Sequence, residues 1–162
     1  MVEELKGYLE KMLEIEEKRY ASEFGRYIDA YRYNVMLKPF ERKLIFEARG
    51  MGKLIETMAS ITMPDDTKPE VQFEVLFDDN LVFDWTCEEY YSLLGLKSIA
   101  GYGGYMIYDP VGKMYSWWTH WGHFGDFNSL LRVWLSNLTN VTVSVNVWDV
   151  QLRVIGEYRI VD

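Results

Sequence analysis

Both histidines of the chain lie close to a carboxylate, in a segment that could bind a metal ion. His120, His123 and Asp126 follow one another at intervals of three residues, and imidazole and carboxylate are ligands that suit zinc, iron or manganese. A helical turn would place them on one face. However, Gly122 and Gly125 disfavour a helix, and residues three apart in a strand point to opposite faces. We therefore expect no catalytic residue, no resident metal and no cofactor. A small metal-dependent enzyme that uses His120 and His123 stays as a third hypothesis.

Three of the six tryptophans, Trp117, Trp118 and Trp121, lie close together in the sequence. Flat aromatic side chains on a β-sheet can stack on sugar rings, while Asp126 or Asn128 would hydrogen-bond the hydroxyls. This predicts, as an alternative function, a carbohydrate-binding β-sandwich module used for attachment. Adjacent strand residues face opposite ways, so we favour one of Trp117 and Trp118 in the core and the other in a subunit interface, where Trp and Tyr are enriched.

Other motifs indicate structure rather than chemistry. The run Gly101–Gly104 lacks the Lys-Ser/Thr of a phosphate loop and reads as a turn. Cys87 is the only cysteine, which excludes an internal disulfide and a cysteine zinc cluster, and we interpret it as a structural thiol. Asn137 and Asn140 each begin a glycosylation sequon, and whether these are used is left open.

Composition narrows the function classes. The 162 residues carry a formal charge of -8, which argues against direct nucleic-acid binding, and 49% are apolar, enough for a core. No apolar run is long enough to cross a membrane, and the charged N-terminus does not resemble a signal peptide. We expect a location in a virion or in the cytoplasm, without membrane insertion.

The N-terminal residues 1–36 are predicted to form a long helix, separate from a domain at 37–162. Apolar residues recur at intervals of three and four, first at Val2, Leu5, Leu9 and Met12 and then at Tyr20, Phe24, Tyr27 and Tyr31. Two roles stay open for this helix, which either packs over a sheet face or projects and contacts a neighbouring copy.

After Pro39 the pattern changes to the alternation of β-strands. We expect a mainly β fold, an antiparallel jelly-roll-like β-sandwich with short helices inserted in loops. Strands are predicted at 43–48, 53–63, 71–77, 81–85, 105–109, 114–119, 141–154 and 157–161, with a tight turn at 49–52. Short helices are predicted at 86–95 and 128–136. The apolar phase changes by one residue near Trp148, which predicts a bulge or a corner and therefore either one long bent strand or two strands in this region.

The segment from Asn140 to Leu152, NVTVSVNVWDVQL, resembles the late strands of viral jelly-roll coat proteins. The resemblance implies a shell-forming structural protein whose subunits meet edge to edge. The chain departs from that pattern because it begins with an acidic helix instead of a basic arm.

These observations together predict a non-enzymatic structural or assembly protein, a virion or shell component that associates with itself or with other shell proteins. The residues expected at its interfaces are apolar or aromatic: Leu5, Leu9, Met12, Tyr20, Phe24, Tyr27, Trp117, Trp118 and Trp121.

Overall fold

The sheet of this protein is built from segments in which every second side chain is apolar and buried. In the computed structural model, burial alternates strictly along β3 (Val71–Phe77) and along much of β9 (Val143–Ile160). The structure describes residues 1–83, 86 and 103–161, with the side chains of all of these except 18, 21–24, 103–108 and 123. The described chain is mainly β, as predicted, and its strand pairs are antiparallel.

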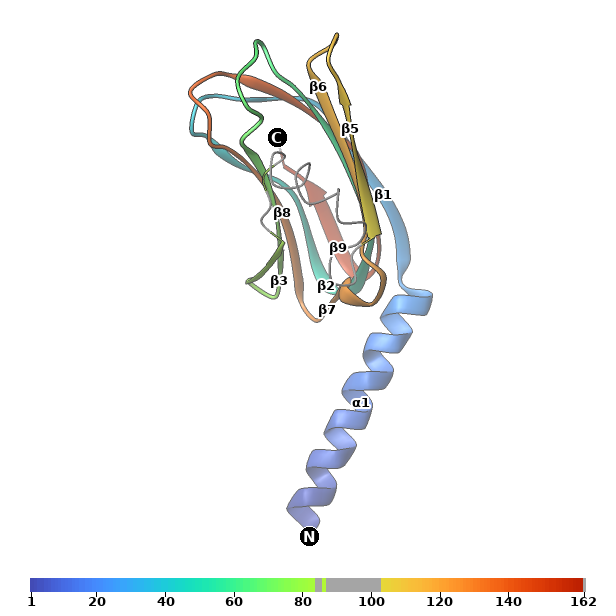
Figure 1. The fold of residues 1–162 in the computed structure, drawn as a ribbon. Coiled ribbons are helices and arrows are strands. Elements are labelled where there is room, and N and C mark those ends of the chain that lie inside the picture. Colours follow the sequence, from blue (N-terminus) through green and yellow to red (C-terminus); the bar gives the residue numbers. More distant parts are fainter. Residues whose placement is uncertain (84–85, 87–102, 162) are drawn as a thin grey trace.

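One helix, α1 (Val2–Phe24), precedes the strands and extends away from the end of the sheet (Figure 1). The remaining elements follow in chain order: β1 (Arg26–Leu37), β2 (Arg42–Thr62), β3, β4 (Asn80–Phe83), β5 (Gly103–Asp109), β6 (Met114–His120), a 3-10 turn η2 (Gly122–Phe124), β7 (Asp126–Phe127), β8 (Leu130–Asn137) and β9. The predicted hairpin of residues 105–109 and 114–119 is confirmed as β5 and β6.

Strand β2 is the centre of the sheet, which has nine strands within the described residues. One of its edges pairs with β9 from Phe46 to Thr62. Its other edge pairs in turn with β8, β7 and β6. From β2 the strand order continues through β9 to β1 on one side, and through β8 and β3 to β4 or through β6 to β5 on the other.

Strands β2 and β9 bend together at a pair of glycines. Gly50 and Gly156 lie opposite each other in the register and have φ angles of +128° and +154°. A Cβ at Gly156 would lie 1.9 Å from the carbonyl oxygen of Arg49, so no side chain fits there. The tight turn predicted at 49–52 is therefore wrong, because the glycines bend one continuous strand and do not separate two.

The bend brings the two arms of the sheet together around an aromatic core. Phe73 of β3 meets the Trp117 ring of β6 edge-on, with ring centroids 5.8 Å apart. Trp121, which follows β6, contacts Phe77 and Phe83 at 5.8 and 5.6 Å. Edge-to-face contacts of this kind stabilise a core beyond the area that they bury.

The N-terminal helix is shorter than predicted. It ends at Phe24, and residues 26–37 form β1 instead of continuing the helix to residue 36. Ile28 and Ala30 are buried while Tyr27 and Tyr31 are exposed, which is a period of two. The spacing of Tyr20, Phe24, Tyr27 and Tyr31 fits a helix equally well, and pairing with β9 decides between the two structures.

The helix predicted at 128–136 is also wrong, because this segment contains strand β8. Leu131, Val133 and Leu135 are buried in alternation, and both edges of β8 are paired, with β2 and with β3. Their period of two outweighs the helical spacing of Leu130, Leu131 and Trp134. The helix predicted at 86–95 lies outside the described residues, except for a bridge between Thr86 and Gln72.

The phase change near Trp148 is confirmed as a bulge in one long strand. Met58 of β2 pairs with Asp149, and the next residue, Ala59, pairs with Val147, so Trp148 is an extra residue in β9. Of the two alternatives for this region, one long bent strand or two strands, the single strand is confirmed: β9 begins at Val143 and continues through Gly156 to Ile160.

The glycine pair yields a test of the bend. We expect Gly156→Ala to destabilise the protein by about 2 kcal/mol or more, because the added methyl group collides with the backbone at a positive φ. Gly7→Ala is the matched control, since nothing lies within 4 Å of that position in α1 and alanine favours a helix. Urea unfolding of the three proteins measures both effects. A Gly156→Ala protein as stable as the wild type would contradict the account of the bend.

Candidate functional site

The apolar side chains of α1 are the most exposed part of the predicted interface. Leu5 is 61% exposed, and Leu9 and Met12 are each 59% exposed. Val2, Tyr8, Leu13 and Ile15 on the same helix are also more than half exposed. Tyr20 is exposed as well, whereas Phe24 ends the helix and its side chain lies outside the described set. In the described part of the chain, the first half of α1 has no apolar surface packed on it.

The base of α1 is attached to the sheet by a small set of contacts. Arg153 of β9 donates a hydrogen bond from Nη1 to the carbonyl oxygen of Gly25, at 3.2 Å. The same guanidinium lies 5.7 Å from the ring centre of Tyr27, the first predicted interface residue beyond the helix. Met51 and Ile155 line a shallow hollow together with the helix residues Glu16, Glu17 and Tyr20. These contacts hold the last turns of α1 and leave its N-terminal half projecting (Figure 1).

The tryptophan cluster does not form a surface site in this chain. Trp117 and Trp121 are 3% and 0% exposed and belong to the core. This agrees with the expectation that one of Trp117 and Trp118 is a core residue, and it removes Trp117 and Trp121 from the surface available for an interface of the folded subunit. The indole of Trp121 donates a hydrogen bond to the Thr57 hydroxyl at 3.2 Å. Trp118 is half-buried and contacts His120, with ring centroids 6.0 Å apart. Of the three, Trp118 alone keeps part of its surface for another molecule.

The segment with the two histidines is divided between two strands and the turn that joins them. His120 ends β6, His123 lies in η2 and Asp126 begins β7. The side chain of His123 is outside the described set. Among the side chains that the structure describes, no group of three or more His, Cys, Asp or Glu residues could hold a metal ion.

The remaining sequence motifs have separate outcomes. Asn137 is fully buried, and its amide nitrogen donates to the carbonyl oxygens of Leu37, Lys38 and Val141, so this sequon is closed to a glycan. Asn140 is exposed. Cys87 and the start of the Gly101–Gly104 run lie outside the described residues. Within those residues, no helix is long and apolar enough to cross a membrane.

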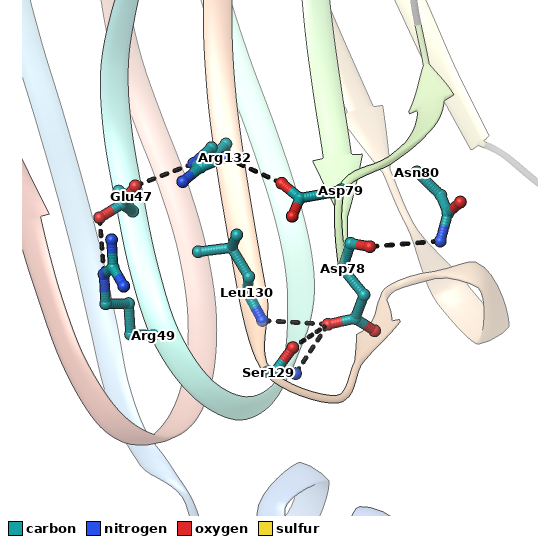
Figure 2. A network of polar contacts seen from close by, with 8 residues as sticks. All are labelled: Glu47, Arg49, Asp78, Asp79, Asn80, Ser129, Leu130 and Arg132. Carbon is teal, nitrogen blue, oxygen red and sulfur yellow. Dashed lines mark hydrogen bonds and ion pairs between the residues drawn. The ribbon is translucent and has the colours of Figure 1, made fainter.

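A network of charged residues joins the strands on the face of the sheet opposite the core (Figure 2). Glu47 of β2 is only 3% exposed and accepts hydrogen bonds from Arg49 and Arg132, both at 2.9 Å. Arg159 adds a third contact at 3.3 Å. Burial alone would raise the pKa of Glu47, but the arginines outweigh burial and hold it below its ordinary value. Each of these three arginines pairs with Glu47 through Nε, and Arg132 also reaches Asp79.

Asp78 joins the β3–β4 turn to the turn before β8 (Figure 2). Its carboxylate accepts hydrogen bonds from the backbone N–H groups of Asn128, Ser129 and Leu130 and from the Ser129 hydroxyl. These donors outweigh the effect of burial and lower the pKa of Asp78. Asp78 and Asp79 both have positive φ, as the central residues of a two-residue hairpin turn require.

A second group of carboxyl groups, not singled out from the sequence, lies across β1, β9 and β2. Gln151 of β9 is opposite Asp29 of β1 and Glu56 of β2, and its amide donates to Asp149 at 2.6 Å. Burial, together with hydrogen bonds and repulsion from the carboxyl groups of Asp29 and Glu56, raises the pKa of Asp149 to about 8. With this pKa, Asp149 is mainly protonated near neutral pH, and its proton can be shared with the carboxyl group of Asp29 or Glu56.

Three exposed aromatic residues beside this group were also missed: Tyr31 and Tyr33 of β1 and Trp148 of β9. The change of apolar phase at Trp148 predicted the bulge in β9. It gave no indication that Tyr31 and Tyr33 of β1 would lie beside Trp148.

Comparisons with known proteins give no family. No protein-family model matches the sequence, and no curated protein matches it.

The turn contact of Asp78 predicts an acid-dependent loss of stability. Because its pKa is lower in the folded protein, its contribution is present above the ordinary pKa of 3.8 and is lost as the pH falls below it. We expect Asp78→Ala to cost about 2 kcal/mol at pH 7 and progressively less towards pH 3. Asp66→Ala is the control, because Asp66 is 95% exposed in its pair with Lys113. Equal effects of the two substitutions in urea unfolding would refute this assignment.

The carboxyl group of Asp149 predicts the opposite pH dependence. The pKa of Asp149 is higher in the folded than in the unfolded protein. The protein is therefore most stable with respect to this group at low pH, and it loses stability as the pH rises from about 4 to about 8. Asp149→Asn should remove this decline and stabilise the protein at pH 8 by about 1–2 kcal/mol, since solvent screens partly exposed groups. Thermal unfolding between pH 4 and 9 provides the measurement. A variant whose curve stays parallel to that of the wild type would show that Asp149 is ionised throughout.

Proposed function

We propose that this protein is a non-enzymatic assembly protein whose α1 helix packs against α1 of a second copy. The observation that carries the proposal is the exposed apolar face of α1, whose leucine and methionine side chains at positions 5, 9 and 12 are about 60% exposed. Burying a leucine stabilises a complex by about 2 kcal/mol, so a helix of this kind gains most from a partner.

The spacing of the side chains supports a helix as the partner. Val2, Leu5, Leu9 and Met12 follow intervals of three and four, the pattern by which two helices interlock. Glu3, Gly7, Glu10 and Glu14 follow the same intervals on the opposite face and stay in water. At about 1.5 Å per residue the helix is about 34 Å long, so its exposed half alone provides several turns of contact.

The charges of α1 favour a protein partner over a lipid surface. The helix contains seven glutamates against four lysines and arginines, and anionic lipids would repel it. Both signs occur along its polar face, where Lys6 and Glu10 approach within 4.0 Å. Charges of both signs let two copies of the helix pair side by side.

The attachment of α1 supports a structural role. Arg153 and the contacts around Met51 and Ile155 fix the base of the helix on β2 and β9, the longest strands of the sheet. The helix is therefore attached directly to the central strand pair. The finer assignment that we propose, a jelly-roll-like virion or shell component, is supported by the resemblance of the Asn140–Leu152 segment to coat-protein strands.

A pair of substitutions that add the same charge to opposite faces of α1 tests the proposal. Leu9→Glu should weaken self-association by roughly a thousandfold, because a symmetric contact loses two leucines of about 2 kcal/mol each. Gly7→Glu adds the same charge to the polar face, where nothing lies within 4 Å, and should leave association unchanged. Sedimentation velocity over a range of protein concentrations measures both.

Removal of residues 1–19 provides a second arm of this experiment. We expect a folded sheet that no longer assembles, whose near-ultraviolet circular dichroism still reports the packed aromatic core while the far-ultraviolet helix signal of α1 is lost. The proposal is wrong if Leu9→Glu and the truncated protein form the same oligomer as the wild type, or if the wild type is monomeric at all concentrations. Association that requires an added shell component would transfer the role of partner from a second copy to that component.

A further inference from the structure

Three exposed aromatic side chains form a strip on the outer face of β1 and β9, away from α1. Tyr31, Tyr33 and Trp148 are 57%, 48% and 43% exposed. The rings of Tyr31 and Tyr33 stack with centroids 5.1 Å apart, and Trp148 lies 5.2 Å from Tyr33. Contiguous exposed aromatic side chains do not stabilise the core, and such surfaces commonly mark the binding site of a ligand or a partner.

Two irregularities in the strand pairing build this strip. In β9, Trp148 is the extra residue of the bulge. As a result two consecutive residues, the exposed Trp148 and the half-buried Asp149, separate the buried Val147 and Val150. In β1, the register shifts between Arg32 and Val35, and Asn34 has a φ of +56° and donates its N–H to the Asn146 side chain. Bulges re-aim side chains and occur next to binding sites more often than elsewhere.

The indole of Trp148 is held across the strand that carries it. Its Nε1 donates a hydrogen bond to the Ser60 hydroxyl of β2 at 2.9 Å, and its ring contacts Tyr33 of β1. Because β9 lies between β1 and β2, the ring spans β9 from one neighbour to the other. In this position Trp148 stays 43% exposed, and an exposed flat indole is a surface on which the apolar face of a sugar can stack.

Hydrogen-bonding groups of both kinds lie next to the strip. Asp149 directly follows Trp148, and it meets Asp29 of β1 and Glu56 of β2 on the same face. The hydroxyls of Tyr31 and Tyr33 can donate and accept, whereas the carboxyl oxygens of Asp29 and Glu56 accept. Sugar hydroxyls need donors and acceptors side by side, and the carboxylates would repel an anionic ligand.

We propose that Tyr31, Tyr33 and Trp148, together with Asp29, Glu56 and Asp149, form a binding site for a neutral saccharide chain. One sugar ring stacks on the Trp148 indole, and the hydroxyls of the next reach the carboxyl groups. The site is independent of α1 and lies on the face opposite the buried Trp117 and Trp121.

Calorimetry and tryptophan fluorescence with the full-length chain test the site. The probes are cellohexaose, xylohexaose, mannohexaose and maltohexaose, accompanied by a printed glycan array. We expect at least one neutral glycan to bind and to quench tryptophan emission. Trp148→Ala should weaken that binding at least about tenfold, and Trp148→Phe should restore part of it.

Trp134→Ala is the matched control, because Trp134 is half-buried on β8, which carries no residue of the proposed site, and packs there on the Arg42 guanidinium; this variant should bind like the wild type. The proposal is overturned if the wild type gives a flat response to all four oligosaccharides and to the array. It is also overturned if Trp148→Ala binds a glycan as the wild type does, or if Trp148→Ala changes the sedimentation mass instead, because the strip would then be a protein interface.

Discussion

The pairing of β2 with β9 is the interaction on which the rest of the structure depends. The two strands pair from Phe46 to Thr62, and every other strand except β4 and β5 joins one of them directly or, in the case of β3, through β8. Strand β2 pairs with β8, β7 and β6 one after another along one edge. The arm of the sheet that contains β8 and the arm that contains β6 are therefore both hydrogen-bonded to this single strand. The glycine pair Gly50 and Gly156 makes this possible, since it bends both strands together without breaking their pairing.

The same strand pair also separates the two faces of the molecule. Its inner face carries the apolar residues that close on Trp117 and Trp121, and its outer face carries charged and aromatic residues. Among the latter, the buried Glu47 holds three arginines across β8, β2 and β9, so the outer face is ordered by ion pairs and not only by the hydrogen bonds of the sheet. Where the register is interrupted, at Trp148 and at Tyr33–Asn34, aromatic side chains are turned outward. The exposed aromatic strip thus follows from departures from regular pairing.

The sequence was informative where one periodicity dominated. Strict alternation predicted β3 and much of β9, and the change of phase at Trp148 predicted its bulge. The sequence was ambiguous where apolar residues fitted both a helical and a strand period, as at Tyr20–Tyr31 and at Leu130–Trp134. Pairing with strands that are distant in the chain decides such cases, and the local sequence pattern carries no information about that pairing. For the same reason the sequence could not tell which of Trp117 and Trp118 is the core residue, that Trp121 joins it there, or that Asp149 meets Asp29 and Glu56, whose positions are far away in the chain. The leucine stripe of α1, by contrast, depends on local spacing alone, and its exposure agrees with one of the two roles expected of it.

Helix α1 is the least explained element if the subunit acts alone, because it exposes a row of apolar side chains and adds little to the core. In the proposed assembly, the base of α1 stays fixed on β2 and β9, and a second copy buries the apolar side chains of the projecting half. Hydrogen–deuterium exchange of the amides in residues 2–24, measured at low and high protein concentration, tests this most directly. The account predicts that exchange in α1 slows markedly as the concentration rises, while exchange in β2 and β9 stays the same. Fast exchange in α1 at every concentration would contradict it.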